Sequence, residues 1–118
     1  MILRHPECDQ IRIDGVLSAL GNPVRLAAVA VLDAGGKHNC SSVLNVLGVT
    51  SKSTMTHHWR VLRESGVIWQ WPSGRENLLS LRREDLDARY PGLLDAILAG
   101  ARHDQEASRD QDAQPAGR

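Results

Sequence analysis

The sequence predicts a mostly α-helical chain with one small β-hairpin. Apolar residues recur at helical spacing in four segments, at 9–20, 22–33, 41–47 and 51–65, and glycines separate these segments. The stretch 67–81 instead alternates about a Ser-Gly turn, as two paired strands do. At 118 residues, the chain fits one domain with a single small core.

The first two predicted helices are adjacent and strongly apolar. Four residues of the first helix share one face: Ile13, Val16, Leu17 and Leu20. Gly21 ends this helix, and Asn22-Pro23 then offers an N-cap followed by a proline at the first helical position. The second helix leaves almost no polar face, so we expect it at the centre of the core.

The fourth helix is the most informative element, because helical geometry divides it into two unlike faces. Ser51 can cap it, as Ser41 or Ser42 can cap the short third helix. One stripe is mostly apolar and is expected to face inward: Met55, His58, Trp59 and Leu62. The opposite stripe is polar: Ser53, Thr56, His57 and Arg60. On an arbitrary helix such a stripe is solvated surface, but a capped helix and turn before it and a hairpin after it favour a binding surface.

The segment after the fourth helix is predicted to fold back on itself. Residues 67–71 and 78–81 alternate as two strands, and 72–75 form the loop between them. We expect Trp69 and Trp71 to pack the hairpin against the fourth helix.

The C-terminal part is predicted to hold a short acidic helix at 84–89 and a final helix that starts at Pro91. The apolar residues of the final helix are Leu93, Leu94, Ile97 and Leu98. No apolar period continues beyond Gly100. We therefore predict three parts, namely a flexible arm at 1–8, one domain at 9–99 and a disordered tail at 100–118.

Charge is unevenly distributed along the chain, although the formal net charge is zero. Between residues 52 and 83 there are six bases and two acids, which gives +4, whereas from residue 84 onward eight acids outnumber four bases. Affinity for phosphate depends on the local field, so the basic middle segment is compatible with a nucleic-acid partner. Because the total is zero, long-range attraction is weak, and tight binding is expected to need a second copy of the site.

The composition excludes several classes of protein. No apolar run approaches the roughly 18 residues needed to span a bilayer, and the start lacks the apolar region of a signal peptide, so we expect a cytoplasmic location. Two cysteines are too few for a secreted disulfide framework. Because we find no phosphate loop, no paired carboxylates in an apolar setting and no nucleophile with a base, we expect neither an enzyme nor a cofactor.

The order of elements is that of a winged helix-turn-helix, in which a helix enters the major groove of DNA and a basic hairpin lies beside it. The predicted DNA contacts lie on the fourth helix and the hairpin tip: Ser51, Lys52, Ser53, Thr54, Thr56, His57, Arg60 and Arg75. Ser53, Thr56 and His57 are expected to approach base edges, and the basic residues to contact phosphate or the minor groove. The alternative is a winged-helix module that binds protein, which the hairpin tryptophans and neutral charge favour.

Three segments of the chain resemble the ArsR/SmtB family of bacterial repressors: ALGNPVRLAAVAVL, SKSTMTHHWRVLRESGVI and PSGRENLLSL. The resemblance covers residues 12–98 and implies a homodimer that represses a promoter and releases it when an inducer binds. It places the dimer interface on the first and last helices, and two apolar stripes at opposite ends of a small domain support this independently. The interface residues are then Ile13, Val16, Leu17, Leu20, Leu93, Leu94, Ile97 and Leu98.

The inducer is not specified by the sequence. The family's thiolate site needs Cys-x-Cys on the third helix, where this chain has Cys40 alone, and its other metal site needs histidines on the last helix, which has none before His103. Both departures argue against inherited metal sensing. Three alternatives stay open: a makeshift metal site from Cys8, His38 and Cys40, a thiol switch helped by a lowered cysteine pKa at a helix start, or cysteines that only pack. A small molecule or a redox signal thus remains the expected inducer.

Overall fold

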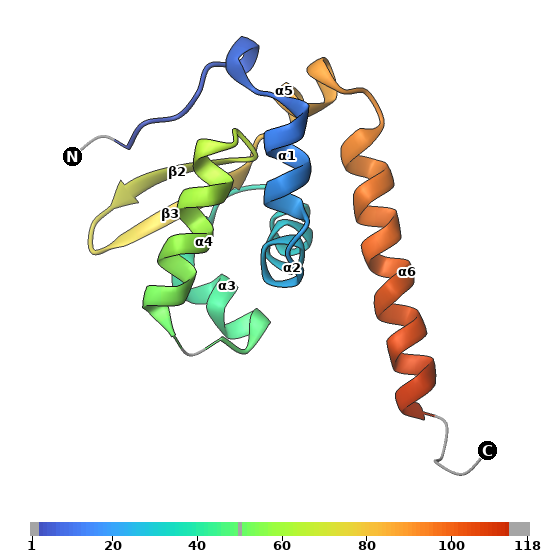
Figure 1. Cartoon of the computed structure of the whole chain (residues 1–118). Coiled ribbons are helices and arrows are strands. Elements are labelled where there is room, and N and C mark those ends of the chain that lie inside the picture. Colours follow the sequence, from blue (N-terminus) through green and yellow to red (C-terminus); the bar gives the residue numbers. More distant parts are fainter. Residues whose placement is uncertain (1–2, 50, 114–118) are drawn as a thin grey trace.

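In the computed structural model, which describes residues 3–49 and 51–113, helices pack beside a small three-stranded sheet at one edge of the molecule (Figure 1). The elements in chain order are η1 (Cys8–Gln10), α1 (Ile13–Leu20), α2 (Pro23–Leu32), β1 (His38–Asn39), α3 (Cys40–Leu47), α4 (Lys52–Glu64), β2 (Ile68–Ser73), β3 (Glu76–Leu81), α5 (Arg83–Arg89) and α6 (Leu93–Ala113). This confirms the predicted class, mostly α with a hairpin beside the fourth helix.

Two of the three predicted helix caps are confirmed. The Asn22 side chain accepts the N–H groups of Val24 and Arg25 at 2.9 and 3.1 Å, and the Ser51 hydroxyl accepts that of Thr54 at 3.3 Å. The prediction for the third helix was wrong, since Asn39 caps it by accepting the N–H of Ser42 at 2.8 Å. Asn39 is held in an extended conformation because it pairs with β3, and α3 therefore begins at Cys40.

The sheet has the strand order β1-β3-β2, with both pairings antiparallel. The hairpin register runs from Ile68 opposite Leu81 to Ser73 opposite Glu76, so the turn is only residues 74–75 and not the predicted 72–75. The two-residue strand β1 is too short to show a period, and the sequence did not indicate it. Because β3 is central, β2 is an outer strand whose far edge faces the N-terminal segment.

Alternation along β2 turns its aromatic residues away from α4. Ile68 and Gln70 are buried, whereas Trp69 is 38% exposed on the other face. The Arg82 guanidinium lies 3.7 Å from the centroid of Trp69, and Lys37 Nζ lies 5.4 Å from that of Trp71. The expectation that these tryptophans pack against the fourth helix was therefore wrong.

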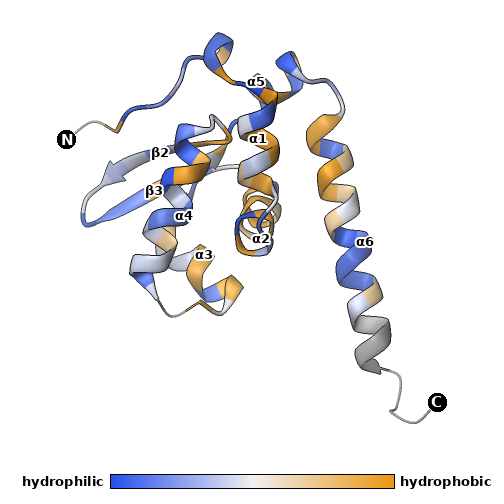
Figure 2. Cartoon of the chain, in the orientation of Figure 1, coloured by the Kyte–Doolittle hydropathy of each residue, from blue (hydrophilic) through white to orange (hydrophobic). Residues whose placement is uncertain are grey.

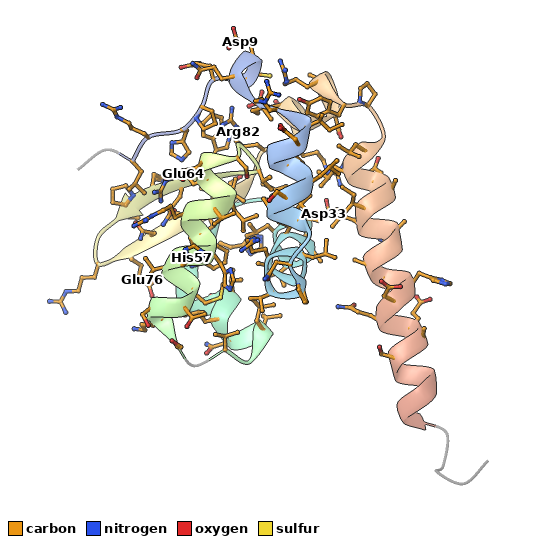
Figure 3. All side chains as sticks on the ribbon, viewed as in Figure 1. Asp9, Asp33, His57, Glu64, Glu76 and Arg82 are labelled. Carbon is orange, nitrogen blue, oxygen red and sulfur yellow. The ribbon has the colours of Figure 1, made fainter. Side chains whose placement is uncertain are left out.

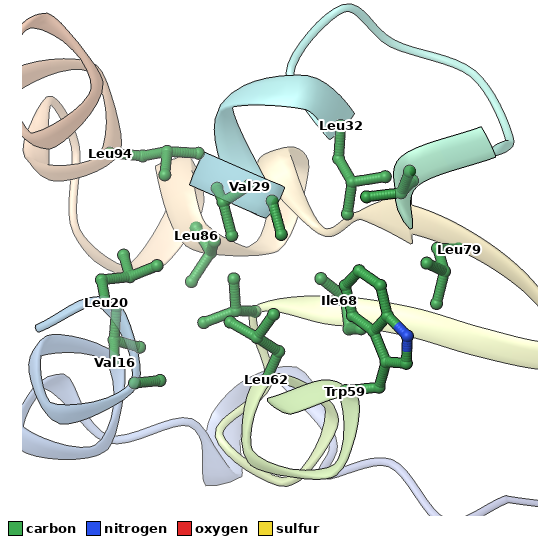
Figure 4. Packing of buried hydrophobic residues seen from close by; sticks show 14 of the residues in the cluster. Val16, Leu20, Val29, Leu32, Trp59, Leu62, Ile68, Leu79, Leu86 and Leu94 are labelled. Atoms are coloured by element: carbon green, nitrogen blue, oxygen red, sulfur yellow. The ribbon is translucent and has the colours of Figure 1, made fainter. Parts of the chain in front are cut away.

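The hydrophobic core lies between α1, α2, α4 and the inner face of the sheet (Figure 4). Residues that meet there include Val16, Leu20, Val29, Leu32, Trp59, Leu62, Ile68, Leu79, Leu86 and Leu94. Each such side chain contributes about 1.5–3 kcal/mol on burial. As predicted, α2 is central, since Ala28, Val29 and Leu32 are completely buried.

The described residues near both ends of the chain form more structure than the sequence predicted. Residues 3–7 pack against β2 rather than forming a loose arm. The final helix continues past Gly100 to Ala113, although its side chains from 102 to 108 are exposed and mostly polar (Figure 2). Ala, Arg, Gln and Glu have high helix propensity, which allows a helix to extend without a packed face. The last part of the predicted tail, 114–118, lies outside the described residues.

Of the helices described, none is by itself long and apolar enough to span a bilayer. The combined segment of α1 and α2 reaches that length and composition, but the two helices meet at an angle of 102°.

Candidate nucleic-acid interface

The two faces of α4 are confirmed by burial. Met55, His58, Trp59 and Leu62 are buried against the core. The polar stripe is exposed along its whole length: Ser53, Thr56, His57 and Arg60 (Figure 3). The helix thus presents hydroxyl, imidazole and guanidinium groups to solvent from a rigid, well-anchored backbone.

His58 fixes α4 relative to the first two helices. Arg25 Nη1 lies 3.1 Å from His58 Nδ1, while Arg25 Nε donates to the Ala19 carbonyl at 2.6 Å. A guanidinium has no acceptor, so His58 Nδ1 must accept this hydrogen bond and be unprotonated. Burial, and then the charges of Arg25 and His57, lower the pKa of His58, which keeps it in that accepting form.

The hydroxyl groups of α4 are not equally free. Those of Ser51 and Thr54 lie 3.0 Å apart in the N-cap, where Ser51 also accepts the Thr54 N–H. Thr56 Oγ1 donates its proton to the Lys52 carbonyl at 2.9 Å, which leaves its lone pairs and its methyl group outward. Thr56 can therefore accept a hydrogen bond from a base or contact a thymine methyl group.

A groove of about 380 Å³ separates α4 from the hairpin and from α3. Four basic side chains line it: Lys52, Arg60, Arg63 and Arg75. Sequence reasoning missed Arg63, although it lies three residues after Arg60 and thus on the same side of the helix. Arg63 Nη1 donates to Gln70 Oε1 at 2.7 Å, so it connects α4 to β2 at the floor of this groove.

Internal ion pairs remove two of the six bases of the middle segment from the surface field. Arg82 pairs with Asp85, and Arg83 binds three carboxylates: those of Asp33, Asp87 and Asp95. Among the described residues, Lys52, Arg60, Arg63 and Arg75 take part in no ion pair. These four bases, three of which are predicted contacts, therefore carry the free positive charge, along one side of α4 and at the hairpin tip.

Comparison with known proteins agrees with this arrangement. A family model described as a helix-turn-helix domain matches residues 20–68, which run from the end of α1 to the start of β2. An HTH-type transcriptional regulator of Bacillus subtilis (strain 168), YceK, is 31% identical over 90 residues, which are 75% of this chain and 88% of that protein. The chain belongs to the same family of HTH-type transcriptional regulators. It is a DNA-binding regulator.

Solved structures show the same fold. A crystal structure of an ArsR family transcriptional regulator superposes with a TM-score of 0.58 at 20% identity, covering 95% of this chain and 100% of that one. The transcriptional repressor BigR from Xylella fastidiosa gives a TM-score of 0.59 at 24% identity, covering 74% of this chain and 83% of BigR.

Four of the eight residues predicted at the dimer interface are already buried within a single chain. Val16, Leu20, Leu94 and Leu98 are buried within a single chain, where α1 and α6 pack into the core. Leu93 and Ile97 are half-buried. Ile13 and Leu17 remain 45% and 49% exposed, because they lie on the side of α1 that faces away from α2 and α4.

Cys8, His38 and Cys40 are not brought together as a set of metal ligands. Cys8 Sγ donates to the Asp85 carbonyl at 3.9 Å, whereas Cys40 begins α3 and His38 bonds the Gly35 carbonyl at 3.0 Å. Burial, then the charge of Glu76, raises the pKa of Cys40, and burial and Asp85 raise that of Cys8. The lowered cysteine pKa that would have helped a thiol switch is therefore not found for either cysteine. Among the described residues, no three His, Cys, Asp or Glu side chains gather as metal ligands.

Proposed function

We propose that this regulator is a dimeric repressor that inserts α4 into the major groove and sets the hairpin tip on the adjacent DNA backbone. The observation that carries the proposal is the coincidence of the exposed polar stripe of α4 with Lys52, Arg60 and Arg75, three of the four bases of the middle segment without an ion pair among the described residues. Helix and hairpin tip lie on either side of one groove, as docking on a duplex requires.

Within this proposal, two kinds of contact are separated in space. Ser53, Thr56 and His57 approach base edges, because they lie in the first half of α4 on its exposed face. Lys52, Arg60 and Arg75 contact phosphate or the minor groove and supply affinity that is independent of sequence. Ser51 and Thr54 stabilise the N-terminus of α4, which directs its backbone N–H groups towards the phosphates of the DNA.

Dimerisation is proposed because a single copy has little net charge with which to hold DNA. The exposed residues Ile13 and Leu17 on α1, together with the part of α6 that projects beyond the core, are available for a second copy. A twofold dimer doubles the basic surface and separates two α4 helices by about one DNA turn, roughly 34–36 Å.

Selection of bound duplexes from a random pool tests the DNA contact. We expect enrichment of a sequence with two related half-sites whose centres lie about one helical turn apart. A pool that returns without enrichment would overturn the proposal of base readout by α4. A reporter placed behind the enriched sequence tests repression, since expression should rise when the regulator is deleted.

A further inference from the structure

The N-terminal arm, residues 3–7, lies along the free edge of the hairpin (Figure 1). The backbone N–H of Gln70 donates to His5 Nε2 at 2.9 Å. This N–H belongs to the outer strand β2 and points away from β3, so it has no partner within the sheet. The imidazole therefore occupies the edge of the strand as an additional acceptor.

A buried arginine makes a second connection to the arm. Arg82 is 2% exposed, and its Nη1 donates to the Pro6 carbonyl at 2.8 Å while Nε and Nη2 bind Asp85 (Figure 3). Its guanidinium covers one side of Trp69, and the His5 ring meets the same indole edge-on at a centroid distance of 5.1 Å. Burying a guanidinium group costs free energy unless its N–H donors are hydrogen-bonded. The Pro6 carbonyl of the arm accepts from Nη1, the Arg82 nitrogen that does not bind Asp85.

The arm is also connected to α4 through Gln70 and through the groove beside that helix. Gln70, whose N–H binds His5, accepts a hydrogen bond from Arg63 of α4 through its side chain. Leu3 lines the groove between α4 and the hairpin beside Arg63 and Gln70. At the end of α4, the backbone of Gly66 is packed so closely by the arm that an added Cβ would lie 3.3 Å from Pro6.

We propose that the arm, through His5, holds the hairpin at a fixed angle to α4 so that Arg75 reaches the DNA backbone, and that protonation of His5 weakens this hold. The proposal rests on the Arg75 contact of the proposed function. His5 is a positioning residue in it, because it acts through Gln70 and the hairpin rather than by touching DNA.

The charges around His5 favour its accepting form. Arg63 from α4 and Arg82 after β3 face it, and Asp85 of α5 is paired with Arg82. Burial, and then these two guanidinium groups, lower the pKa of His5. Once protonated, Nε2 becomes a donor and cannot accept the Gln70 N–H, so the arm loses its hydrogen bond to β2.

A double-mutant cycle with His5→Ala and Arg75→Ala tests the positioning role on a mixed-sequence duplex at low salt. We expect His5→Ala to weaken binding about fivefold, the effect of one typical hydrogen bond, and His5→Gln to restore most of it through its amide oxygen. In the Arg75→Ala background His5→Ala should add nothing. His103→Gln, an exposed histidine on α6, is the matched control, and thermal unfolding verifies that each variant is folded.

The outcomes separate the two proposals. Equal weakening by His5→Ala in both backgrounds, or none in either, overturns the role of the arm. Arg75→Ala that binds like wild type overturns the Arg75 contact itself, which is a different result. As the pH is lowered, the DNA affinity of the wild type should fall more than that of His5→Gln, so the ratio of the two affinities should decrease. His57 is present in both proteins, so its contribution cancels in this ratio. A ratio that stays constant overturns the proposed effect of His5 protonation.

Discussion

At the scale of single residues, Arg75 is the cleanest probe of the proposed backbone contact. It is exposed at the hairpin tip and forms no ion pair among the described residues. We expect Arg75→Ala to weaken binding to every duplex and to reduce the slope of log affinity against log salt by about two, because each of the two copies in the dimer loses one phosphate contact. Titration at several salt concentrations measures both. Arg102→Ala on the exposed part of α6 is the control and should change neither.

Thr56 should behave in the opposite way. Its outward lone pairs and methyl group can read a base edge, so Thr56→Ala is expected to lower affinity for the selected duplex by about 1 kcal/mol. Affinity for random DNA should stay the same. If Thr56→Ala weakens both duplexes equally, the residue contributes no discrimination.

His58 predicts a dependence of stability on pH. Its pKa in the folded state is lowered from an ordinary value of about 6.5, so the unfolded state binds a proton first as the pH falls. The free energy of unfolding should be constant above about pH 6.5 and should decline as the pH falls towards the lower folded pKa. His58→Asn keeps an acceptor for Arg25 and cannot titrate, so it should show a shallower decline in urea titrations. His103→Gln should retain the full decline, and equal curves for wild type and His58→Asn would contradict this role.

At the scale of single residues, the sequence predicted burial correctly where helical geometry alone determines which side chains face the core. The spacing of Met55, His58 and Trp59 fixes which side of α4 is buried, and the structure confirmed it. Sequence reasoning could not find Arg82 as a buried residue, because its burial depends on Asp85 and on a carbonyl 76 residues away. It counted Arg82 as surface charge for the same reason.

At the scale of elements, the junction between α4 and β2 is the most constrained point. Gly66 has a φ of 85°, and an added Cβ would lie 2.5 Å from Ile11 Cγ1. Gly66→Ala is therefore expected to lower the free energy of unfolding through both a left-handed backbone and a clash, by about 2 kcal/mol or more in total. Chemical denaturation measures the loss.

Two other glycines serve as matched controls for this substitution. Gly35 has a φ of 91° and open space around it, so Gly35→Ala should show the backbone cost alone, about 1 kcal/mol. Gly100 lies inside α6 with no atom near its missing Cβ, so Gly100→Ala should stabilise the protein by about 0.5–1 kcal/mol. Equal losses for Gly66→Ala and Gly35→Ala would show that the close packing of Ile11 has no energetic weight.

Element boundaries in this chain depended on contacts that local sequence does not contain. The caps at Asn22 and Ser51 use neighbouring N–H groups and were predictable. The cap at Asn39 and the two-residue hairpin turn both follow from pairing with β3, a long-range contact. The same limit explains why the arm was expected to be loose, since its partners lie on β2 and after β3.

At the scale of the whole molecule, Arg83 links α5 to α2 and α6. Its guanidinium binds Asp33 at the end of α2 and Asp95 in the first turn of α6. This holds the base of α6 in place, and the helix then projects far enough to give the molecule a longest dimension of 55 Å (Figure 1). Because α6 is held against the chain in this way, some of the apolar residues that the family resemblance assigns to dimerisation lie in the core of one chain. Others remain on the exposed side of α1.

That division leads to the last prediction, which concerns assembly. Leu17 is half-exposed on α1 and makes little contribution to the core, so Leu17→Glu should leave the fold intact and place a charge against its own copy across a twofold interface. We expect the wild type to sediment as a dimer and Leu17→Glu as a monomer, with the salt slope of DNA binding reduced by about half. Val46→Glu, which changes a valine that is 67% exposed on α3, introduces the same charge away from α1 and should remain dimeric. If Leu17→Glu remains dimeric while Val46→Glu dissociates, α3 rather than α1 carries the interface.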